Sequence, residues 1–168
     1  MRFLTLAAWL ALLSLFAAPA LHAAAKPKAA ATDVYKIAID RSVSLADAAE
    51  SMRLRANALN LKLVAELPLS KQVEVMTNTT QRTITIFQFC DAVTARDLIQ
   101  LNLDFSVYMP CRIALIEDEK GQGWLVMMDV NVDAVARENR LPAALKTRIE
   151  EVRKSLVSIM QAGAQGEL

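Results

Sequence analysis

Hydrophobic and polar positions along the chain follow two periods, one typical of strands and one typical of helices. Short apolar, alternating or β-branched runs predict strands, because successive side chains of a strand point to opposite faces. Five such runs occur, at residues 34–39, 61–67, 83–89, 112–117 and 124–130. The loop at residues 117–123, which contains Gly121 and Gly123, joins the last two runs as an antiparallel hairpin.

Three longer segments repeat apolar residues every three or four positions, which predicts helices. The first begins after Ser44, an expected N-cap with Asp47 three residues later, and ends near Asn60. The second covers residues 91–103, and the third starts at Pro142 and is expected to end at Gly163. Residues 70–81 and 131–141 stay open between a loop and a short helix, and residues 105–110 are predicted to be extended.

The predicted order of elements is β-α-β-β-α-β-β-α. This order favours a single α/β domain of the two-layer α+β kind, with a mixed β-sheet of about five strands and helices mainly on one face. We expect the domain to cover residues 34–168, with a core at 34–130 and a C-terminal helix at 142–162. That helix is long enough to cover the sheet or to pair with a second subunit.

The N-terminal segment has the layout of a secretory signal. Arg2 precedes an apolar run from Phe3 to Ala18, and small residues follow up to Ala25. The apolar run is shorter than the roughly 20 residues of a membrane-spanning helix. We therefore expect a signal peptide at residues 1–25, cleaved after Ala25 or within about 20–25, and a flexible leader at 26–33. The alternative is an uncleaved anchor.

Export changes the composition of the remaining chain. Removal of Arg2 leaves 18 basic residues against 18 acidic ones, so the formal net charge falls from +1 to zero. The only histidine, His22, is also lost. We expect a periplasmic or secreted protein with no stable membrane insertion after cleavage.

These changes exclude several kinds of chemistry. A chain without histidine has no Ser-His-Asp triad, no Cys-His pair and no imidazole metal ligand. A neutral chain has no bulk attraction to a phosphate backbone, and its few aromatic residues do not interleave with a basic stripe, so we expect no nucleic-acid partner. Gly-rich phosphate-binding loops are absent from the sequence.

We also expect no metal and no cofactor. The segment from Asp129 to Asp133 resembles the start of a calcium loop, but Ala134 and Arg140 occupy the positions where glycine and glutamate are required. Met127 and Met128 could be soft ligands of Cu(I), but they are adjacent in a strand and would face opposite sides. Core filling explains them better.

The two cysteines of the exported chain, Cys90 and Cys111, are the candidate thiol site. In an oxidising compartment an even pair first suggests a disulfide, which requires that the two strands run antiparallel and place both residues at one edge. Separate buried thiols and a reactive or ligand-binding thiol pair are the alternatives. Asp91 and Arg112 follow the cysteines directly. Arg112 could stabilise a thiolate or bind a small anion, or simply pair with Asp91 or Glu117.

The segments Ile86–Asp91 and Pro110–Ile113, with Ala95-Arg96, Glu117-Asp118 and Gly123-Trp124, form a pattern. Together they resemble an uncharacterised family called domain of unknown function 302. The resemblance spans about residues 35–130 and implies a small two-layer α/β domain that is often dimeric. It implies no reaction, because the family has no agreed activity.

The sequence thus leaves three hypotheses about function. The first is an exported domain that binds a small molecule, such as an anionic ligand, or a protein partner, and that catalyses nothing unaided. The second is a thiol-based redox protein or carrier of sulfur compounds that uses Cys90 and Cys111. The third is a structural homodimer held by the helix at 142–162.

Overall fold

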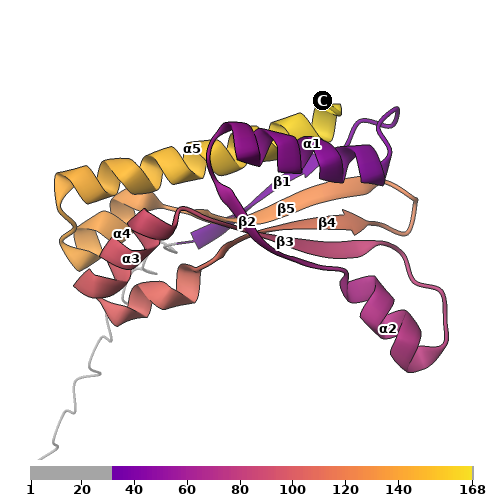
Figure 1. The fold of residues 1–168 in the computed structure, drawn as a ribbon, viewed down its shortest axis with the longest axis horizontal. Coiled ribbons are helices and arrows are strands. Elements are labelled where there is room, and N and C mark those ends of the chain that lie inside the picture. Colours follow the sequence, from indigo (N-terminus) through magenta and orange to yellow (C-terminus); the bar gives the residue numbers. More distant parts are fainter. Residues whose placement is uncertain (1–31, 168) are drawn as a thin grey trace, which may run out of the picture.

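The computed structural model describes residues 32–167, so the expected signal peptide and most of the expected leader lie outside the described residues. Within the described residues, five strands and six helical segments follow one another (Figure 1). The strands are β1 (Thr32–Ala38), β2 (Lys62–Leu67), β3 (Ile84–Cys90), β4 (Cys111–Glu117) and β5 (Gly123–Val130). The helices are α1 (Leu45–Ala58), α2 (Leu69–Thr77), α3 (Ala92–Leu101), the 3-10 helix η1 (Leu103–Tyr108), α4 (Val132–Asn139) and α5 (Ala143–Gln165).

The strands form one sheet in the order β1-β5-β4-β3-β2, and all four pairings are antiparallel. Helices α1 and α5 lie side by side over one face of this sheet (Figure 1). The predicted single two-layer α+β domain with five strands is therefore confirmed. Among the described helices, none is both long enough and apolar enough to cross a membrane.

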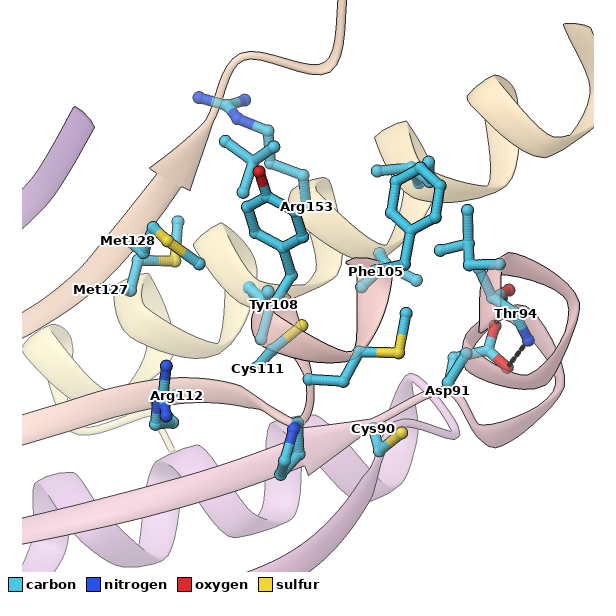
Figure 2. A pocket seen from close by; sticks show the side chains of 18 of the residues that line it. Cys90, Asp91, Thr94, Phe105, Tyr108, Cys111, Arg112, Met127, Met128 and Arg153 are labelled. Carbon is cyan, nitrogen blue, oxygen red and sulfur yellow. Dashed lines mark hydrogen bonds between the residues drawn. The ribbon is translucent and has the colours of Figure 1, made fainter. Parts of the chain in front are cut away.

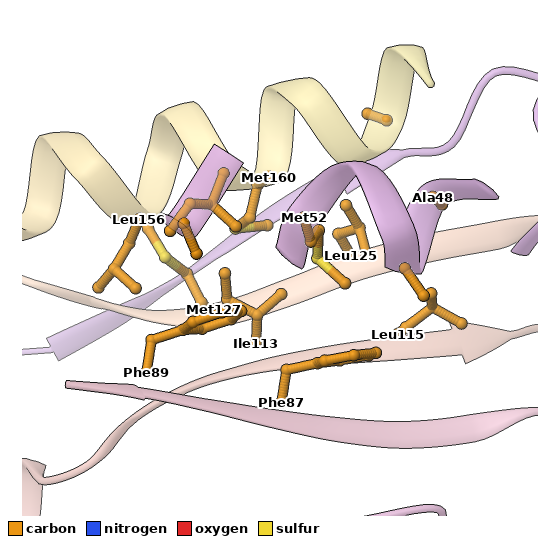
Figure 3. Packing of buried hydrophobic residues seen from close by; sticks show 14 of the residues in the cluster. Ala48, Met52, Phe87, Phe89, Ile113, Leu115, Leu125, Met127, Leu156 and Met160 are labelled. Carbon is orange, nitrogen blue, oxygen red and sulfur yellow. The ribbon is translucent and has the colours of Figure 1, made fainter. Parts of the chain in front are cut away.

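The core lies between the sheet and the pair α1 and α5 (Figure 3). Alternation along β3, β4 and β5 turns every second side chain toward these helices. The strands contribute the buried residues Phe87, Phe89, Ile113, Leu115, Leu125 and Met127. The helices contribute the buried residues Ala48, Met52, Ala56, Leu156, Ile159 and Met160. The apolar stripes seen in the sequence thus meet each other inside one protomer.

The opposite face of the sheet, here called the open face, is not covered by α1 or α5. Register and alternation place on it the strand residues on either side of each core position. Its middle is apolar, with Ile86, Ala114, Val126 and Met128. Its charged strand residues are Lys36, Lys62 and Arg112, and no acidic residue of β1–β5 shares this face.

A second, smaller cluster lies at one end of the sheet. Leu98 of α3, Phe105 of η1, Val135 of α4 and Leu145 of α5 are buried together there. They lie beside the end of β3 and the start of β4, at the left of Figure 1. This cluster positions the candidate site.

Several local predictions need correction. Residues 105–110 were expected to be extended, but Leu103–Tyr108 form a 3-10 helix, started by the Asn102 side chain, which accepts a hydrogen bond from the Asp104 N–H. The two open segments are helical, as α2 and α4. Helix α5 does not end at Gly163 but continues to Gly166, whose φ of +66° suits a glycine cap.

Gly163 has a packing role in place of a capping role. A Cβ atom there would lie 2.6 Å from Met52 Cγ and 3.0 Å from Leu125 Cδ1. The missing side chain lets α5 approach α1 and β5 closely. The apolar stripe of α5 packs in this way against α1 and the sheet. The homodimer that the sequence suggested stays a prediction.

Candidate ligand-binding cavity

A cavity of about 620 Å³ opens at the end of the sheet where β3 ends and β4 begins. Its lining is mostly apolar and comes from all parts of this end: the strands β1, β3, β4 and β5, the segment α3–η1, and the helices α4 and α5. Figure 2 shows the side chains converging on this space. The volume lies in the range of small-molecule sites in proteins.

The cavity exists because β4 and β5 separate at this end. Their pairing stops at Ile113 with Met127, although β4 begins earlier, at Cys111, and β5 continues to Val130. The last residues of β5 pair only with β1. The two strands diverge in Figure 2, and the lining of the cavity includes residues of the helix-covered side and of the open face.

Met127 and Met128 show how the cavity passes between the two sides. As adjacent strand residues they point to opposite faces, as expected: Met127 is 4% exposed in the core, and Met128 is 38% exposed on the open face. Both nevertheless line the cavity. A molecule held here would therefore touch both the core and the open face.

All four residues singled out from the sequence line this cavity: Cys90, Asp91, Cys111 and Arg112. They reach it because β3 and β4 are antiparallel neighbours, with Phe89 paired to Cys111. The end of one strand is thereby placed beside the start of the next. The four residues differ, however, in what they do there.

Asp91 is the N-cap of α3. Its carboxylate accepts hydrogen bonds from the backbone N–H groups of Val93 and Thr94, both at 3.1 Å, and from the Thr94 hydroxyl at 2.7 Å (Figure 2). Burial alone would raise its pKa, but these hydrogen bonds and the charge of Arg148 together lower the pKa of Asp91 below its usual value. Its carboxylate is already occupied by the helix that it starts.

The two cysteines are free thiols, so the predicted Cys90–Cys111 disulfide is not present in this structure. The antiparallel arrangement that a disulfide requires is there, but the register is offset by one residue: Cys111 is paired with Phe89, not with Cys90. Alternation therefore sends the two side chains to opposite faces of the sheet. The structure corresponds to the alternative of two separate thiols.

Both thiols are held in the protonated form. Burial raises the pKa of Cys111 to about 11, with a further contribution from Cys90. Burial also raises the pKa of Cys90, and the neighbouring charge of Asp91 adds to this. Since the thiolate is the reactive form, this environment disfavours a nucleophilic cysteine.

Arg112 is exposed on the open face, across from Met128 at the divergence of the strands (Figure 2). The expected pairing with Asp91 or Glu117 is not formed, because Asp91 caps α3 and the Glu117 carboxylate accepts a hydrogen bond from the Thr83 N–H. Within residues 32–167, the guanidinium of Arg112 makes no salt bridge and no hydrogen bond. It is a free cation at an apolar opening.

The sequence did not indicate the far wall of the cavity. Phe105 and Tyr108 project from η1, and Arg153 comes from α5 (Figure 2). Val152 and Leu156 of α5 also line the cavity. The Arg153 guanidinium is bound by Asp129, at 2.6 and 2.8 Å. The signal in the sequence was the aromatic pair Phe105 and Tyr108. It lies in the segment predicted to be extended, which we interpreted as a connector and not as a cavity wall.

No group of three or more His, Cys, Asp or Glu residues is placed to hold a metal ion in the part of the chain that the structure describes. From the described residues the cavity gains apolar surface, flexible methionine side chains and the guanidinium of Arg112. Such an arrangement can enclose a small apolar or amphipathic molecule.

The fold defines a class, a single two-layer domain with an antiparallel five-stranded sheet and a helical layer on one face. The profile of the family described as "Domain of unknown function DUF302" matches residues 35–163. The chain belongs to this family, which confirms the resemblance seen in the sequence.

One solved structure shows the same fold. The crystal structure of an uncharacterized conserved protein DUF302 from Bacillus stearothermophilus superimposes with a TM-score of 0.61 at 15% sequence identity. The match covers 77% of this chain and 96% of the other. No curated protein shows a significant sequence match to the chain.

Proposed function

We propose that this protein is an exported binding protein for a small apolar or amphipathic molecule, held in the cavity between β4 and β5. The observation that carries the proposal is the cavity itself, about 620 Å³ of mostly apolar space at the point where the two strands separate. A purely structural domain would gain stability by closing this space, because empty apolar volume forfeits packing contacts.

The nature of the lining supports reversible binding of a flexible ligand. Met109, Met127 and Met128 contribute thioether side chains, which adapt to ligands of different shape. Phe105 and Tyr108 add aromatic surface from η1. Apolar contact would provide most of the binding free energy, and the few polar groups would orient the ligand.

Binding is supported over catalysis by the chemistry of the polar groups. Asp91 is committed to capping α3, and the thiols of Cys90 and Cys111 are protonated at neutral pH. The alternative of a thiol-based redox or sulfur-carrier protein has less support for the same reason. A protonated, largely buried Cys111 is a slow nucleophile.

Export is the second part of the proposal and is supported by the sequence alone. Residues 1–25 have the charged start, apolar segment and small-residue end of a secretory signal. Intact-mass measurement of the protein from a periplasmic extract tests this. The expected mass is that of a chain starting near Lys26 with two free thiols, and a full-length mass would contradict it.

Titration with an uncharged fluorescent probe, N-phenyl-1-naphthylamine, tests ligand binding. We expect saturable fluorescence enhancement with the wild-type protein and a loss of at least tenfold in affinity for Ala114→Phe, which fills the cavity from β4. The matched control is Ala38→Phe, an equal enlargement on an exposed residue of the open face that does not line the cavity.

Circular dichroism and thermal unfolding check that both variants fold. The proposal is contradicted if the wild-type protein binds no probe. It is equally contradicted if folded Ala114→Phe binds the probe as tightly as Ala38→Phe does.

A further inference from the structure

We infer that the ligand is an anionic amphiphile, an alkyl chain that ends in a carboxylate, with its head group on Arg112 and its chain in the cavity. This inference rests on the proposed function and adds the chemical class of the ligand. It follows from the state of the charged groups around the opening.

Among the described residues that line the cavity, Arg112 is the cation without a salt-bridge partner. The other arginine that lines the cavity, Arg153, is held by two hydrogen bonds from its guanidinium to the Asp129 carboxylate. Arg148, which lies beside Asp91, binds Asp97 at 2.7 Å. Among the described residues, the guanidinium of Arg112 has no salt-bridge or hydrogen-bond partner. It is therefore available to a ligand in the cavity.

The acidic residues at the cavity do not compete for this position. Asp91 accepts three hydrogen bonds at the start of α3. Asp33 is paired across the sheet with Asp129, and alternation places it on the side opposite Arg112; its carboxylate accepts a hydrogen bond from the Val34 N–H. Neither of these two carboxylates therefore faces Arg112.

The open face as a whole favours an anion. Its charged strand residues are Lys36, Lys62 and Arg112, with no acidic partner among the strand residues of that face. Since these side chains surround a low-dielectric apolar surface, their attraction for an anion is screened less than in bulk water. A carboxylate is well suited to a guanidinium because the two can form paired hydrogen bonds.

The chain of the ligand is matched by the apolar path that starts beside Arg112. Val126, Met128 and Ala114 lie on the open face around the opening, and Met127 and Leu156 lie on the inner side. An alkyl group that passes between β4 and β5 would be in contact with apolar atoms on both sides. Each buried methylene contributes about fourfold in affinity.

Isothermal titration calorimetry with the intact mature protein tests this inference. The probes are hexanoate, octanoate and decanoate below their micellar concentrations, each compared with the alcohol of equal length. We expect the affinity to rise roughly fourfold per methylene. We also expect decanoate to bind at least roughly fivefold more tightly than decanol, because a partly exposed ion pair contributes about 1 kcal/mol.

Three variants separate the charge of Arg112 from general effects. Arg112→Gln should abolish the preference for decanoate over decanol, and Arg112→Lys should keep part of the preference. Arg82→Gln is the control, because Arg82 is exposed, does not line the cavity and makes only a long 3.9 Å contact to Glu119.

The outcomes distinguish this inference from the proposed function. If the wild-type protein binds decanoate and decanol with equal affinity, and Arg112→Gln does the same, the anionic head group is overturned while cavity binding stands. Absence of binding by decanol, decanoate and the uncharged probe overturns both. Binding to phosphatidylglycerol vesicles without binding of monomeric decanoate overturns the inference in favour of a membrane surface.

Discussion

At the scale of single residues, Gly163 shows how one missing side chain sets the distance between two layers. A Cβ atom would lie 2.6 Å from Met52 Cγ and 3.1 Å from the backbone oxygen of Ala48. The backbone of α1 cannot move aside as a side-chain end could. The close approach of α5 to α1 therefore requires glycine at this position.

We expect Gly163→Ala to destabilise the protein by about 1–3 kcal/mol, the usual cost of overpacking a dense core. Urea unfolding followed by circular dichroism measures the change. The control is Gln161→Ala, an exposed position in the same helix, which should change stability by less than about 0.5 kcal/mol. A stabilised Gly163→Ala variant would show that the helices can separate without cost.

Asp91 gives a pH-dependent contribution with a defined sign. Its folded pKa is lowered, whereas the unfolded pKa is about 3.9, so the carboxylate stabilises the fold above the unfolded value. This contribution is lost as the pH falls through the folded pKa. Part of it comes from the charge at the N-terminus of α3 and part from the cap hydrogen bonds.

Asp91→Asn keeps a side-chain oxygen for the cap and removes the charge. We expect it to be less stable than wild type by up to about 1 kcal/mol at pH 6, with a difference that shrinks as the pH falls through the lowered pKa of Asp91. Asp91→Ala should be about 1 kcal/mol less stable than Asp91→Asn, at pH 6 and at low pH alike, because the cap is lost. Thermal unfolding across this pH range is the measurement, and a gap between Asp91→Asn and wild type that does not change with pH would contradict the assignment.

At the scale of elements, burial separates methionines that look alike in the sequence. Met160 of α5 is 0% exposed between the helix and the sheet, whereas Met76 of α2 is 83% exposed. Helix α2 is attached mainly through Ser70, whose hydroxyl accepts a hydrogen bond from the Ile84 N–H at 3.2 Å. The layer α1–α5 therefore holds the fold, and α2 is peripheral.

We expect Met160→Ala to cost about 2–5 kcal/mol, because it leaves a cavity in the core. Met76→Ala, the same substitution on an exposed residue, should change stability by less than about 0.5 kcal/mol. Both are measured by chemical unfolding. Similar losses from the two variants would mean that α2 is packed against a partner in solution.

Most elements of the fold could be predicted from the sequence because their apolar periods are long and regular. The strands with Phe87 and Ile113 and the helix with Leu156 and Ile159 are examples. The end of α5 was missed, since a glycine in close packing and a glycine in a cap look the same in one sequence. The 3-10 helix was missed because Phe105 and Tyr108 suit an extended segment equally well.

The candidate site could be predicted only in part. Cys90, Asp91, Cys111 and Arg112 were found because they adjoin the ends of two strands, and antiparallel pairing brings those ends together. Whether Cys90 and Cys111 form a disulfide could not be predicted, because this depends on a register offset of one residue that no local sequence pattern reveals. The contribution of α5 to the cavity depends on how the helix lies over the sheet.

At the scale of the whole molecule, the central feature is a sheet that is closed over most of its length and opens at one end. The helical layer stabilises the sheet where β4 and β5 are paired. Where the pairing stops, η1, α3 and the start of α5 surround a cavity instead of filling it. We therefore expect ligand contacts to be confined to the end of the sheet where the β4–β5 pairing stops.

Methyl NMR of ¹³C-methyl-methionine protein, titrated with decanoate, tests this claim most directly, because the methionines sample different regions of the described structure. Met109, Met127 and Met128 line the cavity, Met52 and Met160 lie in the core, and Met76 is exposed on α2. We expect saturable shifts of the three cavity methyl signals, with the other three nearly unchanged. Shifts confined to Met76, or shifts of none of the six signals, would contradict it.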